Sequence, residues 1–125
     1  MPVSARPLAT LSDTICAAYV RALGFRDEFD WAEQRQIEHY GPKPFAELRS
    51  ELLALSKRYT YLSVDLCTLC AKASMKVDTP EFAAEVEQTR KDAKAFLKDC
   101  EAWLSDARVA IPYKLGIDGR PLGKE

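Results

Sequence analysis

Two long runs of apolar residues recur at steps of three and four in the second half of the chain. The first run covers 45–73 and the second covers 82–107. Steps of three and four place side chains on one stripe of an α-helix, where they can be buried against a partner helix. The pattern therefore predicts two long helices, over about 44–75 and about 79–108.

Residues that favour helix ends lie at the borders of both runs. Pro44 can occupy a first helical turn, because its missing amide hydrogen would have no helical acceptor there. Thr79 can cap the second long helix, and Pro80 suits its first position. Because the link between the two helices is short, we expect them to be antiparallel neighbours, with Leu48 opposite Trp103.

Residues 60–68 also fit a second pattern. Apolar and polar side chains alternate there and β-branched residues are frequent, which is typical of a half-buried strand. The steps of three and four pass through the same residues, and no turn residue interrupts them. We therefore predict helix for this segment.

The first forty residues predict two shorter helices. The first is expected to begin at Thr10 or Ser12, whose hydroxyl groups can accept amide hydrogens, and to end at Gly24. The second is expected over 25–40, with Asp30 as a capping residue. The two shorter helices can cover the apolar surface of the long pair, which completes a four-helix bundle.

The expected organisation is all-α, with one helical domain over 11–108. Residues 1–10 hold two prolines and few large apolar side chains, which indicates an extended arm. Glycine and proline recur in 109–125, which indicates an irregular tail. A chain of 125 residues is long enough to bury a core of its own without disulfides.

Charge and hydropathy restrict the surroundings of the protein. The formal net charge is -1, so no overall field attracts the chain to nucleic acid or to anionic lipid. No apolar run approaches the roughly 20 residues of a membrane span, and the N-terminus has no apolar stretch typical of a signal peptide. We therefore expect a cytoplasmic protein, no membrane partner, and four cysteines in the reduced form.

Cys67 and Cys70 have the spacing of half a zinc site. The antiparallel arrangement places Cys100 about 22 Å from them along the helix axis, too far for one tetrahedral metal shell. Reactive pairs of this spacing usually lie at a helix N-terminus, whereas this pair lies toward a C-terminal end. We expect free, structural cysteines and no metal or cofactor, with a metal or redox site at Cys67 and Cys70 as an alternative.

The sequence lacks the motifs of the common hydrolytic and di-iron enzymes. We therefore predict a non-enzymatic helical interaction protein, such as an adaptor, assembly subunit or inhibitor, that presents its long hairpin and its tail to a protein partner. Self-association through the apolar segment 59–71 belongs to the same class, and the tail can act on its own bundle or on a neighbour. The residues predicted to contact a protein partner are Tyr59, Tyr61, Ile111, Tyr113, Leu115, Ile117 and Leu122.

A second hypothesis is a nucleic-acid-binding helical module. Basic residues gather near the middle of the long hairpin, where they can contact a phosphate backbone, although acidic residues interrupt them. Such a patch is also typical of an ordinary charged surface. The residues of this alternative are Lys57, Arg58, Arg90, Lys91, Lys94 and Lys98.

Overall fold

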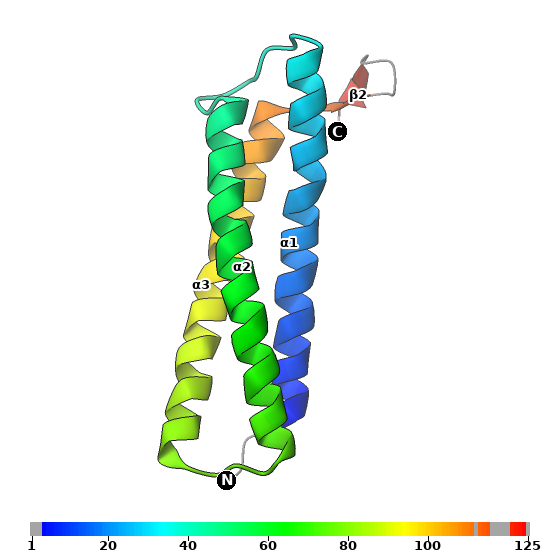
Figure 1. Ribbon diagram of the computed structural model, residues 1–125. Coiled ribbons are helices and arrows are strands. Elements are labelled where there is room, and N and C mark those ends of the chain that lie inside the picture. The colour runs from blue at the N-terminus through cyan, green and yellow to red at the C-terminus, as the bar shows by residue number, and fades with distance from the viewer. Residues whose placement is uncertain (1–3, 112, 116–120, 125) are drawn as a thin grey trace.

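The computed structural model describes residues 4–111, 113–115 and 121–124, and three long helices dominate that part of the chain (Figure 1). The helices are α1 (Ala5–Gln34), α2 (Phe45–Ser74) and α3 (Pro80–Ala110). Two short strands follow, β1 (Tyr113–Leu115) and β2 (Pro121–Lys124), which pair with each other in antiparallel orientation. The prediction of a helical fold with packed helices is confirmed, whereas the predicted four-helix bundle is wrong.

The two predicted N-terminal helices are one continuous helix, α1. Gly24 lies in its middle, where an added Cβ would meet no atom within 4 Å. Glycine costs a helix about 1 kcal/mol relative to alanine, and burial of the flanking apolar side chains exceeds that cost. The buried side chains of α1 continue past Gly24 in a seven-residue repeat, and they belong to Leu8, Ile15, Ala18, Ala22, Phe29 and Ala32.

The ends of α1 also differ from the prediction. The helix begins after Ser4, whose Oγ accepts a hydrogen bond from the amide of Arg6 at 3.4 Å. Pro7 falls in the first turn, where no amide hydrogen is required, so the segment 5–10 is helical and not extended. Residues 1–3 of the predicted arm lie outside the described part of the chain.

At its C-terminal end α1 stops at Gln34, six residues before the predicted end. Gln36 adopts a left-handed conformation with φ of 58°, and the amide of Ile37 donates to the carbonyl of Ala32 at 2.8 Å. This pattern is the Schellman motif, in which a residue in the left-handed conformation and a backbone hydrogen bond from the next residue end a helix. Asp30 is therefore an interior residue of the helix and not a cap.

Helices α2 and α3 form the predicted antiparallel hairpin. Pro44 is the N-cap of α2, and the side chain of Thr79 caps α3 by accepting from the amide of Phe82 at 3.1 Å. The expected facing of Leu48 and Trp103 is confirmed, because the Trp103 indole Nε1 donates to the Leu48 carbonyl at 2.9 Å. Segment 60–68 is helical throughout.

Helix α1 covers one side of this hairpin and contacts both of its helices (Figure 1). Near the middle, Tyr19 stacks on Tyr59 of α2 at a ring distance of 4.5 Å. Near the loop before α2, the Phe29 ring lies between Phe45 at 5.3 Å and Trp103 at 5.9 Å. The apolar surface of α2 is thus covered on one side, and the opposite side of the hairpin is left to solvent.

The end of the chain departs from the predicted irregular tail. Helix α3 continues to Ala110, and the amide of Tyr40 donates to the Ala110 carbonyl at 3.1 Å, which ties the loop before α2 to this end. Strands β1 and β2 then occupy part of the predicted tail. Along the described residues, no helix combines the length and the apolar character that a bilayer crossing requires.

Candidate functional site

Helices α2 and α3 carry a charged residue at every seventh position along the edges that face each other. Seven residues make about two helical turns, so each set forms a nearly straight row along its helix. The helices are antiparallel, so the two rows meet in four facing pairs, which we call the charge ladder. The pairs are Lys72 with Glu85, Asp65 with Asp92, Arg58 with Asp99, and Glu51 with Asp106.

Two pairs of the charge ladder join opposite charges. The Lys72 ammonium lies 3.2 Å from a carboxylate oxygen of Glu85. The Arg58 guanidinium lies 2.6 Å from a carboxylate oxygen of Asp99, and it also lies over the ring of Phe96, 5.6 Å from the ring centre. These pairs link α2 to α3 on the side of the hairpin that α1 does not cover.

The pair of Glu51 and Asp106 joins two negative charges, and the chain supplies a cation between them. Lys43, from the segment before α2, places its Nζ 2.9 Å from Glu51 Oε2 and 2.9 Å from Asp106 Oδ2. The hydrogen bond to Asp106, and then that to Glu51, raise the pKa of Lys43 above its usual value. A cation of the chain itself therefore lies between the two carboxylates and offsets one of their two negative charges.

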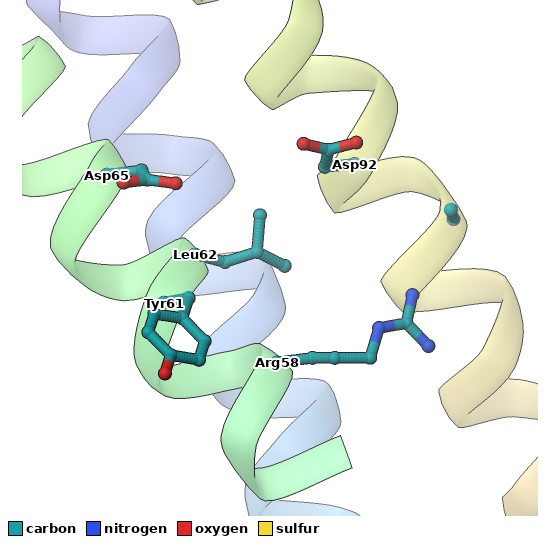
Figure 2. Close-up of a pocket in the computed structure, with 6 residues that line it drawn as sticks. Arg58, Tyr61, Leu62, Asp65 and Asp92 are labelled. Atoms are coloured by element: carbon teal, nitrogen blue, oxygen red, sulfur yellow. The ribbon is translucent and has the colours of Figure 1, made fainter. Parts of the chain in front are cut away.

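The pair of Asp65 and Asp92 also joins two negative charges, but no cation of the described residues forms an ion pair with either one. Figure 2 shows the two carboxylates facing the space between α2 and α3 from opposite sides. Asp92 accepts a hydrogen bond from the Gln88 amide group at 3.0 Å, which leaves its negative charge in place. In the part of the chain that the structure describes, this pair differs from the other three because no cation pairs with either of its members.

A hollow of about 240 Å³ lies at the unneutralised pair, with Leu62 and Ala95 on its apolar side and Tyr61 at its edge (Figure 2). Neighbouring hollows of about 310 Å³ share Arg58 with it at one end and Asp65 and Asp92 at the other. The three hollows thus form one groove along the outer side of the hairpin, which we call the α2–α3 groove.

The lining of the α2–α3 groove is acidic, although the whole chain is nearly neutral. Its two cations are Lys43 and Arg58. Its six carboxylates belong to Glu51, Asp65, Glu85, Asp92, Asp99 and Asp106. A negative groove of this kind attracts positively charged partners and repels polyanions.

The predicted protein-binding residues separate into exposed and packed positions. Tyr61 is 73 % exposed at the edge of the groove. Tyr59 packs against α1, where a hydrogen bond with the Cys16 thiol, together with burial, raises the pKa of its hydroxyl. Ile111 is only 8 % exposed, so Tyr59 and Ile111 both pack against the rest of the chain.

The remaining predicted contacts belong to the C-terminal tail. Tyr113 and Leu115 lie in β1, and Leu122 lies in β2. The side chains of these three residues, and Ile117 as a whole, lie outside the described part of the structure.

The predicted basic patch is divided among different surfaces. The Arg58 side chain lines the acidic groove and pairs with Asp99. Lys57 leaves the same helix about 100° from Arg58 around the helix axis. Arg90 is half-buried. Its other members are exposed on α3, and they are Lys91, Lys94 and Lys98. Nucleic-acid binding stays a prediction, and the sign of the groove charge does not favour it.

Cys67 and Cys70 take different environments. Cys67 is exposed, whereas Cys70 is half-buried with its Sγ 3.9 Å from the carbonyl oxygen of Ala5. Burial, with a smaller effect of Cys67, raises the pKa of the Cys70 thiol, which disfavours the nucleophilic thiolate. Within the described residues, no group of three or more His, Cys, Asp or Glu side chains is arranged to hold a metal ion.

The sequence patterns did not single out Leu53 and Val64, which are each 59 % exposed on α2, nor the pair of Asp65 and Asp92. The seven-residue spacing of charges is the signal that could have identified the pair.

No protein-family model, curated protein or solved structure matches this chain. The function is therefore inferred from the chain's own geometry.

Proposed function

We propose that this chain is a non-enzymatic helical protein–protein interaction module that docks its partner on the outer surface of α2. The carrying observation is that α2 exposes three large apolar side chains, those of Leu53, Tyr61 and Val64. The other large apolar residues of α2 are buried or half-buried. Apolar area removed from water on docking contributes roughly 25 cal/mol per Å².

Two features support an interaction role for the hairpin. A tyrosine at the edge of a hollow is a residue type that often supplies much of the binding energy of an interface. The adjoining groove has an apolar floor and charged borders, which is the usual composition of a docking surface. We propose the cytoplasm as the setting, with the C-terminal segment 113–122 as a second contact region.

The test compares the partners captured by the wild-type chain with those captured by a triple variant, Leu53→Gln, Tyr61→Gln and Val64→Gln. A matched control changes two exposed polar residues of α1, Thr10→Gln and Thr14→Gln. We expect the triple variant to keep its helical circular dichroism and its cooperative unfolding. The amount of partner that it captures should fall at least about tenfold below that of the wild type. Equal recovery by both variants and the wild type would refute the proposal.

Two further measurements define the components of the interface. Light scattering at high concentration reports whether the partner is a second copy, because a monomer of 14.0 kDa would double in mass. A chain truncated after Ala110 reports on the tail. We expect weaker capture by the truncated chain, and full capture would remove the tail from the interface.

A further inference from the structure

Two pairs of the charge ladder join negative charges, and they differ in one respect. Between Glu51 and Asp106 lies the ammonium of Lys43, within hydrogen-bond distance of both carboxylates. Between Asp65 and Asp92 lies the hollow of about 240 Å³. The two pairs are separated by two seven-residue repeats along the same rows, and the first pair is an example in this chain of a cation held between two such carboxylates.

We infer that Asp65 and Asp92 bind the side chain of a lysine or arginine presented by a helix of the partner protein, which lies along the α2–α3 groove. This inference rests on the proposed interaction role and names the charge that the partner must carry. The partner's cation would form an ion pair with both carboxylates, as Lys43 does with Glu51 and Asp106. Its aliphatic stem would contact Tyr61 and Leu62 at the hollow.

A helix suits the shape and the charge of the groove. The hollows follow the hairpin from Lys43 to Glu85, which matches an elongated occupant. The side chains between the charge-ladder residues are small at several points of the lining, so a helix backbone can approach closely. These small residues are Ala54, Ala95, Ala102 and Thr68.

The charges around the hollow favour a cation in spite of Arg58, which also lines it. The guanidinium of Arg58 is paired with Asp99 and lies over Phe96, so its charge is already compensated. At the other end Glu85 is compensated by Lys72. The uncompensated charge of this part of the groove therefore belongs to Asp65 and Asp92.

The test uses the full-length chain, labelled with nitrogen-15, and an alanine-rich peptide of about 17 residues, long enough to be helical in water. The peptide carries one central arginine, and its control carries citrulline, which has a similar shape and no charge. The variants are Asp65→Asn and Asp92→Asn. The matched control is Asp13→Asn, which removes an exposed carboxylate of α1.

We expect the arginine peptide to produce saturable amide shifts at Tyr61, Asp65, Asp92 and Ala95. Either groove variant should weaken binding by about threefold or more, and Asp13→Asn should leave it unchanged. The citrulline peptide should bind as weakly to the wild type as the arginine peptide does to the variants.

Several results would overturn the inference. They are equal binding of the two peptides, unchanged binding in both groove variants, shifts spread evenly over the surface, and no saturable shifts. Tighter binding of magnesium chloride alone at the same amides would assign the pair to a metal ion. A dimer that dissociates in Asp65→Asn would assign it to a second copy of the chain.

Failure of this inference is separable from failure of the proposed function. If the arginine peptide does not bind while the triple apolar variant still loses its partner, the partner docks without a cation at this pair. If the triple variant keeps its partner and the peptide does not bind, both proposals are wrong.

Discussion

Replacing Asp92 by lysine should stabilise the fold, although Asp92 is an exposed residue. The substitution turns the unneutralised pair of the charge ladder into an ion pair between α2 and α3. Asp65 then faces a positive charge, as Asp99 faces Arg58 one repeat away. The expected increase in the free energy of unfolding has two sources. The repulsion between the two carboxylates ends, and an attraction between Asp65 and the new lysine is added.

The magnitude follows from the exposure of the pair. An exposed ion pair contributes about 0.2–1 kcal/mol, and facing like charges cost a similar amount. The substitution loses the exposed hydrogen bond from Gln88 to Asp92, which is worth about 0.2–0.5 kcal/mol. The net gain should be about 0.5–1.5 kcal/mol. For a chain of 125 residues each 1 kcal/mol raises the midpoint temperature by about 4 °C.

The assay is urea unfolding followed by circular dichroism, at low salt and in 1 M sodium chloride. Asp92→Asn, which only ends the repulsion, should gain about half as much as Asp92→Lys. The double variant Asp65→Lys with Asp92→Lys should gain nothing, because it restores a like-charged pair. High salt should reduce all of these differences. A destabilised Asp92→Lys variant, or a double variant with the summed gain of two single ones, would refute the facing of the two residues.

Three other predictions concern the fold. Gly24→Ala should stabilise the chain by about 0.5–1 kcal/mol, because an added Cβ meets no atom within 4 Å in the middle of a helix. Gly41→Ala should destabilise it by more than about 1 kcal/mol, because φ is 79° at Gly41 and the new Cβ would lie 2.5 Å from a methyl carbon of Val109. Chemical denaturation of both variants checks these changes in stability. Lys43→Met should cost about 1 kcal/mol at low salt and less in 1 M salt, and an equal loss at both would contradict the electrostatic role. Burial raises the pKa of the Cys100 thiol from 9.0 to about 11, so this thiol loses its proton at a lower pH in the unfolded chain than in the folded one. The free energy of unfolding should therefore fall by roughly 2 kcal/mol between pH 9 and 11. Cys100→Ala should show a smaller fall over the same range, and an identical one would contradict this cause.

The two long helices of the hairpin could be predicted because large apolar side chains mark their buried stripes. Phe45 and Leu48 begin one stripe and Trp103 lies in the other, and the structure buries all three. In α1 the buried stripe includes Ala18 and Ala22, whose small side chains give a weak hydropathy signal. The glycine at position 24 led to the prediction of an early helix end.

The candidate site was only partly accessible from the sequence. The charges of the ladder recur every seven residues, and the predicted hairpin could have paired them. The sequence alone does not show that Lys43 reaches Asp106, because that contact depends on the path of the loop before α2. For the same reason, only the folded arrangement shows that none of the described cations pairs with Asp65 or Asp92.

The most direct test of a docking role for this groove combines stability and binding in one variant, Asp92→Lys. The partner captured by the wild type is quantified on the variant under the same conditions. We predict that the variant unfolds at a higher temperature than the wild type. The amount of partner that it captures should be at least about threefold lower, because its own lysine replaces the partner's cation. Full retention of the partner by this more stable variant would contradict a role for Asp65 and Asp92 in docking.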